Sequence, residues 1–201
     1  MHNHFHSNPD LRPAGERFFV RSEAGEDVPL RRIRLSDTPE CFGGGRNPDF
    51  FMTDVTGGYG AADAGETVEL VRRERPEPGS PTQLAAARAG VVTPEMAYAA
   101  ARENANLEGF AASLSEPGLE RVRDRLMPLL ERVEPWTGER VRARVAARQA
   151  VIPAAFTHPE VEPTVIGRHF ATKVNANVGT SASSSDWREE GRKMQEALAR
   201  G

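Results

Sequence analysis

Residues 164–179 read TVIGRHFATKVNANVG, and residues 183–201 read SSSDWREEGRKMQEALARG. Apolar and polar residues alternate over 173–178, a pattern that is typical of a strand. Asp186 is a suitable N-cap for a helix over the second run, because its side chain can accept a free backbone N–H. A strand followed by a helix is half of a β–α–β unit, so the end of the sequence indicates a β/α fold.

Three short runs near the N-terminus have the composition of strands, at 17–20, 28–35 and 50–55. Arg31 and Arg32 interrupt the apolar alternation of the second run, so we expect a β-bulge or an edge strand there. The first part of the chain is therefore predicted to be rich in β-structure.

Helical periodicity dominates the middle of the chain. The runs with this pattern cover residues 82–90, 93–105, 117–133 and 137–149. The third run places six apolar residues on one stripe, and Pro128 within it should kink or split the helix.

Composition excludes several classes of protein. The formal net charge of -3 gives no electrostatic reason to expect a nucleic-acid partner. The only cysteine, Cys41, cannot form an internal disulfide or supply a multi-cysteine iron–sulfur or zinc site. No apolar run reaches the roughly 18 residues of a membrane span, and the first ten residues lack the apolar core of a signal peptide. We expect a cytoplasmic protein with no membrane partner.

Several longer stretches follow the ordered motifs of a known family. Residues 83–104, QLAAARAGVVTPEMAYAAAREN, are similar to Q-L-H-Y-A-R-x-G-I-I-T-P-E-M-E-x-x-A-I-R-E-N. Residues 139–183 contain HPEVEPTVIGR and KVNANVG, which are similar to H-P-E-x-E-P-M-I-I-G-R and V-K-I-N-A-N-I-G. The chain thus resembles phosphomethylpyrimidine synthase, and the resemblance covers roughly residues 17–201.

The resemblance implies a radical S-adenosylmethionine enzyme, a carbon–carbon lyase of thiamine biosynthesis. Its substrate would be 5-aminoimidazole ribotide, and its product would be hydroxymethylpyrimidine phosphate. The family implies a 4Fe–4S cluster, S-adenosylmethionine, a zinc ion and a homodimer. The C-x-x-C-x-x-x-x-C cluster motif and the metal-binding histidines of the family are absent from this sequence. We therefore expect the chain to be inactive by itself.

The resemblance also implies the fold. We expect an α+β N-terminal domain, then helices, then the first β/α unit of an incomplete (β/α)8 barrel, because a whole barrel takes about 250 residues. The expected parts are a disordered tail at 1–15, a β-rich subdomain at 16–71, a linker at 72–81, a helical segment at 82–149 and the barrel start at 150–201.

Asn177 is the candidate substrate-binding residue. It matches the second asparagine of the family's N-A-N-I-G motif, which resembles a substrate-contacting position. It would lie near the carboxyl end of its strand, where barrel enzymes place their sites, on the same face as Asn175. The competing interpretation is an asparagine that satisfies the backbone at a strand end. Lys173 on that face should pair with a carboxylate such as Glu160 or Glu162.

Other polar and aromatic residues are interpreted structurally. His158 and His169 lack a third ligand at a suitable spacing, so hydrogen-bonded histidines are favoured over a metal site. Asp54 is interpreted as a turn cap, with a partner-positioning role as the alternative. Tyr59 and Trp187 are interpreted as packing residues. No catalytic or metal-binding residue is assigned.

Two alternatives to a synthase fragment remain. The chain could be a non-catalytic module that dimerises or pairs with a barrel-bearing chain. It could also resemble an enzyme that converts the same ribotide to a benzimidazole, although the N-terminal domain favours the thiamine branch.

Overall fold

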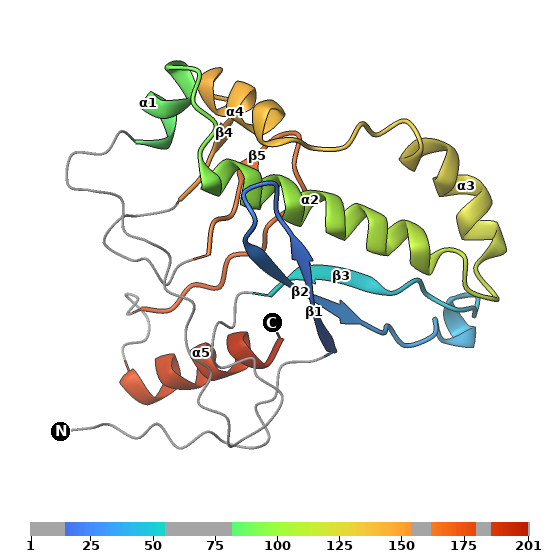
Figure 1. The fold of residues 1–201 in the computed structure, drawn as a ribbon. Helices are drawn as coiled ribbons and strands as arrows, with labels where there is room; N and C mark the ends of the chain where they lie inside the picture. The colour runs from blue at the N-terminus through green and yellow to red at the C-terminus, as the bar shows by residue number, and fades with distance from the viewer. Residues whose placement is uncertain (1–14, 55–81, 154–161, 180–185, 201) are drawn as a thin grey trace.

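The computed structural model describes residues 15–54, 82–153, 162–179 and 186–200 (Figure 1). The elements in chain order are β1 (Glu16–Arg21), β2 (Asp27–Ile33), the 3₁₀ helix η2 (Glu40–Phe42), β3 (Phe50–Thr53), α1 (Gln83–Arg88), α2 (Pro94–Ser113), α3 (Glu120–Leu130), α4 (Gly138–Ala146), β4 (Ala150–Val151), β5 (Ile166–Gly167) and α5 (Trp187–Arg200). A small sheet followed by helices confirms the predicted α+β class. The predicted linker and nearly all of the predicted tail lie outside the described residues.

β1, β2 and β3 form an antiparallel sheet with β2 in the centre. Val20 pairs with Val28 and Leu30 pairs with Thr53, and the register continues without a bulge. The prediction of a bulge or edge strand at Arg31 was therefore wrong. The Arg31 side chain is only 3% exposed, and its charge is matched by Asp54, which lies 3.3 Å away. A paired charge can occupy an interior strand face where an unpaired one could not.

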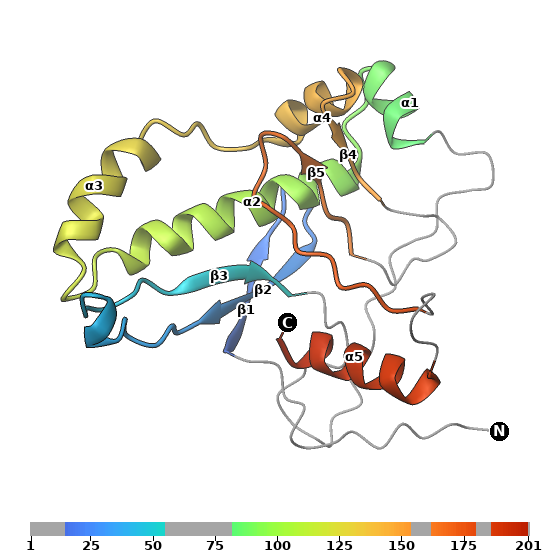
Figure 2. The same cartoon turned by 180° about the vertical axis from the view of Figure 1, so that it is seen from behind.

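α2 lies across one face of this sheet (Figures 1 and 2). Val28 and Leu30 of β2 are fully buried against Tyr98 and Ala105 of α2. Gly109 permits the close approach of α2 to β3, because a Cβ at this position would lie 2.4 Å from the ring of Phe51. The first hydrophobic core is thus shared by the sheet and the helix.

The opposite side of α2 packs against α4, and α4 in turn packs against α1 (Figure 2). This second core contains Ala87, Met96, Ala99, Ala100, Trp136, Val141, Val145, Ala150, Ile152, Val165 and Phe170. Thr82, Thr93 and Thr137 cap α1, α2 and α4, each accepting a backbone N–H through its side chain. The helix starts predicted at Thr93 and Thr137 are confirmed.

α3 is amphipathic, yet none of its residues is buried in this chain. Leu119, just before the helix, is buried, whereas Leu129 on the predicted apolar stripe is 57% exposed. The helix is not split at Pro128 and ends two residues later at Leu130. The stripe is present, but the described residues cover only its beginning fully and leave Leu129 exposed.

The predicted strands of the second half are much shorter than expected. β4 and β5 form an antiparallel pair of two residues each. Residues 171–178 are not assigned to a strand, so the strand predicted there does not form in this structure. A strand needs neighbours for its backbone N–H and C=O groups, and none of the described elements forms a ladder with this stretch. The remainder of the barrel stays a prediction.

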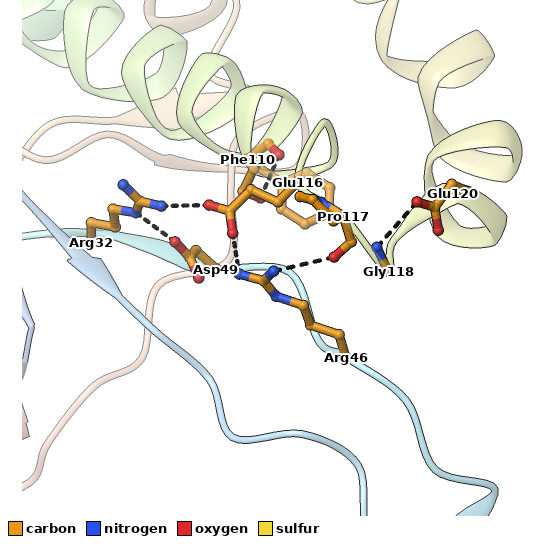
Figure 3. Close-up of polar contacts among 9 residues, drawn as sticks. Arg32, Arg46, Asp49, Phe110, Glu116, Pro117, Gly118 and Glu120 are labelled. Atoms are coloured by element: carbon orange, nitrogen blue, oxygen red, sulfur yellow. Dashed lines mark hydrogen bonds and ion pairs between the residues drawn. The ribbon is translucent and has the colours of Figure 1, made fainter.

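A group of charged side chains connects the sheet to the turn between α2 and α3 (Figure 3). Glu116 pairs with Arg32 of β2 and with Arg46, and Arg32 also pairs with Asp49. We call these four residues the turn cluster. Arg46 also donates to the Pro117 carbonyl at 3.1 Å (Figure 3). The cluster fixes the C-terminal end of α2 against the sheet.

Candidate functional site

The candidate site is centred on residues 171–179, which we call the asparagine segment. The side chains of Asn175 and Asn177 are exposed, and Asn175 Nδ2 donates to Asn177 Oδ1 at 2.7 Å. This contact agrees with the prediction that the two amides share one side of the backbone. Val174 is 96% exposed and belongs to no core among the described residues.

Glu103 of α2 binds the start of the asparagine segment. The Ala171 N–H donates to Glu103 Oε2 at 2.8 Å, and Lys173 Nζ donates to Glu103 Oε1. Lys173 also donates to the Ala171 carbonyl at 2.8 Å. Lys173 therefore pairs with a carboxylate, as expected, but the partner is Glu103 and not the proposed Glu162. Glu162 pairs with Arg102, and Glu160 lies outside the described residues.

Aromatic packing fixes the residue just before the segment. The Phe170 ring stacks on the Trp136 ring with centroids 4.2 Å apart, and both side chains are buried. Asn104 of α2 fixes Trp136 in turn. Its side chain accepts the backbone N–H of Trp136 at 2.7 Å and donates to the backbone carbonyl of Trp136 at 2.8 Å. The start of the asparagine segment is therefore attached to the second core.

Arg102 binds the stretch that leads into β5. Its guanidinium donates to the Pro163 carbonyl at 2.9 Å, to Thr164 Oγ1 at 3.2 Å and to the carboxylate of Glu162. It also donates to the Asp54 carbonyl at 3.0 Å. Burial raises the pKa of the Glu162 carboxyl, although the Arg102 charge and a hydrogen bond from Tyr98 oppose this effect.

Asp54 has a different role from the predicted turn cap. Its carboxylate is fully buried, 2.8 Å from Arg17 Nε and 3.3 Å from Arg31 Nε. Two cations from neighbouring strands compensate the cost of burying this charge. Sequence reasoning missed this because Arg17, Arg31 and Asp54 are brought together only by the sheet register.

Glu190 of α5 binds the other end of the asparagine segment. The Gly179 N–H donates to Glu190 Oε2 at 2.7 Å, and Lys193 Nζ donates to Glu190 Oε1 at 2.7 Å. The hydrogen bond from Lys193, followed by that from Gly179, lowers the pKa of the Glu190 carboxyl. Gly179 has φ +149°, a conformation that favours glycine, which turns the backbone toward α5. Asp186 accepts the Arg188 N–H at 3.0 Å, which confirms it as the cap of this helix.

Three consecutive polar residues of α2, namely Arg102, Glu103 and Asn104, thus contact three different parts of the chain. We call them the α2 polar triad. Sequence reasoning assigned them no role, although a signal was present. They directly follow the apolar run 96–101 and replace apolar side chains where the helix is buried.

A cleft of about 740 Å³ lies beside the start of the asparagine segment. Its lining includes Trp136, Arg140, Arg144, His169 and Phe170. The His169 side chain is exposed. Among the described residues, no hydrogen bond to this side chain supports the predicted structural role. Within the described ranges, no three histidine, cysteine, aspartate or glutamate side chains are grouped closely enough to bind a metal ion.

Two further interpretations concern aromatic residues and a histidine. Trp187 was interpreted as a packing residue, but its side chain is 76% exposed at the start of α5. The interpretation was wrong for this structure, in which Glu190 and not Trp187 makes the described contact between α5 and the asparagine segment. Tyr59 and His158 lie outside the described residues.

A comparison with protein families identifies the chain. The model described as the radical SAM ThiC family matches residues 82–201, which is more than half of the sequence. The chain belongs to this family. The match begins just before α1 and includes the α2 polar triad and the asparagine segment. The resemblance to the thiamine-pyrimidine synthase is thereby confirmed, and with it membership of a radical SAM lyase-type family.

Radical SAM chemistry in the ThiC family implies S-adenosylmethionine and an iron–sulfur cluster. Such a cluster is bound by several cysteine thiolates, whereas this sequence contains only Cys41, whose side chain is exposed within η2. The residues of this chain therefore do not fit the cluster. The zinc ion stays a prediction. Among the described residues, no helix combines the length and apolar character that crossing a membrane requires.

Proposed function

We propose that this chain forms one wall of the 5-aminoimidazole ribotide site of a phosphomethylpyrimidine synthase. In that role it contributes to the conversion of the ribotide to hydroxymethylpyrimidine phosphate in thiamine biosynthesis. Asn177 is the proposed substrate contact. The observation that carries the proposal is the exposed Asn175–Asn177 pair within a sequence that matches the ThiC family.

The chemistry of this pair suits a ribotide. A carboxamide offers two N–H donors and one carbonyl acceptor, which match the ring nitrogens and hydroxyls of a heterocyclic ribotide. The Asn175–Asn177 hydrogen bond uses one N–H donor of the Asn175 side chain and aligns the side-chain carbonyl of Asn177. It leaves the amide NH2 of the Asn177 side chain available toward solvent. The segment is accessible, so a ligand can reach both side chains without displacing a core residue.

We further propose that the 201-residue chain does not complete the reaction by itself. Radical cleavage of S-adenosylmethionine requires an electron from the cluster, and one cysteine cannot provide its thiolate ligands. The cluster ligands and the remaining walls of the site would come from further barrel structure, as the family resemblance implies.

Ribotide binding and turnover test these two parts separately. We expect Asn177→Ala to weaken the affinity for aminoimidazole ribotide by about tenfold, the equivalent of one good hydrogen bond. Asn106→Ala, in the cleft lining, is the matched control and should bind like the wild type. Equal affinity in all three proteins would remove Asn177 from the site. Turnover by the purified chain with iron, sulfide, reductant and S-adenosylmethionine would overturn the proposed inactivity.

The second candidate is a non-catalytic interaction module, in keeping with the homodimer that the family implies. The observation that favours it is the exposed end of the apolar stripe predicted over 117–133, where Leu129 of α3 is 57% exposed and Val133, just beyond α3, is 45% exposed. Replacing both residues by glutamate should reduce self-association in light scattering if this face pairs two copies. A monomer in both proteins, together with ribotide binding, would favour the synthase-wall proposal.

A further inference from the structure

The two ends of the asparagine segment are bound in the same way. At one end, Glu103 accepts the Ala171 N–H through one oxygen and Lys173 through the other. At the other end, Glu190 accepts the Gly179 N–H through one oxygen and Lys193 through the other. The carboxylates come from α2 and α5, which are far apart in the sequence.

Each of the two carboxylates also binds a lysine. Lys173 and Lys193 are the only lysines in the sequence, and every other cationic side chain apart from histidine is arginine. Both lysines therefore occur at these two carboxylates. A lysine carries a compact charge with three donors, and it can share a carboxylate with a backbone N–H more easily than a planar arginine fork can.

We propose that Glu103 and Glu190 are positioning residues that fix the two ends of the asparagine segment and thereby present Asn177 to the ribotide. This role rests on the proposed function for its ligand, but the anchoring itself does not. Hydrogen bonds to a charged acceptor are stronger than those between neutral groups, so two of them can replace strand pairing at the segment ends.

The arrangement also explains the contrast between burial and exposure in the segment. The carboxylate groups lie at the boundary of the packed structure, with Glu103 4% and Glu190 8% exposed. Residues 174–178 between the anchors are exposed. Positioning residues at the ends therefore leave the middle accessible, whereas a core contact at Asn177 would have buried the side chain that must meet the ligand.

Amide hydrogen exchange on the full 201-residue chain tests the anchoring. Glu103→Gln should speed exchange at the Ala171 amide by about tenfold and leave exchange at the Gly179 amide unchanged. Glu190→Gln should speed exchange at the Gly179 amide by about tenfold and leave exchange at the Ala171 amide unchanged. Glu108→Gln is the matched control, because Glu108 is exposed on α2. The midpoint of global unfolding identifies any general loss of structure. Unchanged exchange at both amides in both variants would overturn the proposal.

Ribotide affinity then tests the consequence for the site. If the wild type binds and Asn177→Ala does not, Glu103→Gln and Glu190→Gln should each weaken binding several-fold, and Glu103→Asp should restore part of the loss. Wild-type affinity in both glutamine variants would overturn the positioning role. If no protein binds ribotide, the proposed function fails for this chain, and amide exchange alone decides the anchoring.

Discussion

The α2 polar triad and the turn cluster both make ion pairs from α2 or from the turn that follows it. They differ in burial and in the parts of the chain that they contact. The α2 polar triad lies within the helix and is largely buried, with Arg102 2% and Glu103 4% exposed. The turn cluster joins Glu116, just beyond the C-terminal end of the helix, to the sheet (Figure 3). The Arg32 side chain is 43% and the Glu116 side chain 29% exposed. Both groups make ion pairs, but only the triad connects α2 to the asparagine segment and to the stretch before β5.

The comparison indicates which contacts control the fold and the site. An exposed ion pair gains little because water screens it, whereas breaking a buried pair leaves a charge without solvent or partner. The triad should therefore dominate stability even though the turn cluster contains more charged residues, four against two. The predictions below test this difference, beginning with the largest expected effect.

Arg102→Ala should lower the free energy of unfolding by about 3–5 kcal/mol, because Glu162 loses its cationic partner and the buried carbonyls of Asp54 and Pro163 lose their donor. Arg102→Lys should lose less, since it keeps the charge without the planar fork. Urea unfolding measures both. Arg121→Ala, at an exposed position on α3, is the control and should remain within about 0.5 kcal/mol of the wild type.

Asn104→Ala should cost about 2 kcal/mol, because the N–H and C=O of Trp136 both lose their partner. Asn104→Asp keeps an acceptor for the Trp136 N–H and should cost less than the alanine variant. The same urea measurement applies, with Trp136 fluorescence as a second probe. An alanine variant as stable as the wild type would show that water replaces these hydrogen bonds without loss.

Glu116→Gln should cost at most about 1 kcal/mol, and the difference should shrink further in high salt. The reason is the partial exposure of its arginine partners, of which the Arg46 side chain is 25% exposed. A loss as large as that of Arg102→Ala would show that burial does not separate the two groups, and the comparison would then fail.

The smallest expected effect is the pH dependence at Glu190. Its pKa is lowered in the folded state, so its stabilising contacts are complete above the ordinary carboxyl pKa of about 4.3. They are lost as the pH falls through the lowered pKa. The protection of the Gly179 amide, corrected for intrinsic exchange, should therefore decrease in acid. Glu190→Gln should show no such acid-dependent loss.

Local signals were sufficient for much of the fold. Strand-like composition predicted β1 and β3, and threonines with suitable spacing predicted the starts of α2 and α4. The bulge or edge strand predicted at Arg31 was wrong, and the strand lies in the centre of the sheet. Asp54, the carboxylate that compensates the Arg31 charge, lies more than twenty residues away in the sequence. Strand pairing at 171–178 could not be decided locally, since a ladder requires a partner strand.

The site could be predicted only in part. The family resemblance singled out Asn177, and the alternation placed it beside Asn175, which the structure supports through their hydrogen bond. The positioning residues Glu103 and Glu190 could not be predicted from the resemblance or from the alternation. Glu103 lies about seventy residues from Lys173 in the sequence, and only the packing of α2 against the Phe170 region brings them together.

The central claim is that the asparagine segment is the part of this chain that meets the ribotide. The most direct test is a titration of the ¹⁵N-labelled chain with aminoimidazole ribotide, followed by two-dimensional NMR. We expect the largest shifts at the side-chain amides of Asn175 and Asn177 and at the backbone of residues 173–179. Shifts confined to the cleft beside Trp136, with none in the asparagine segment, would contradict the account.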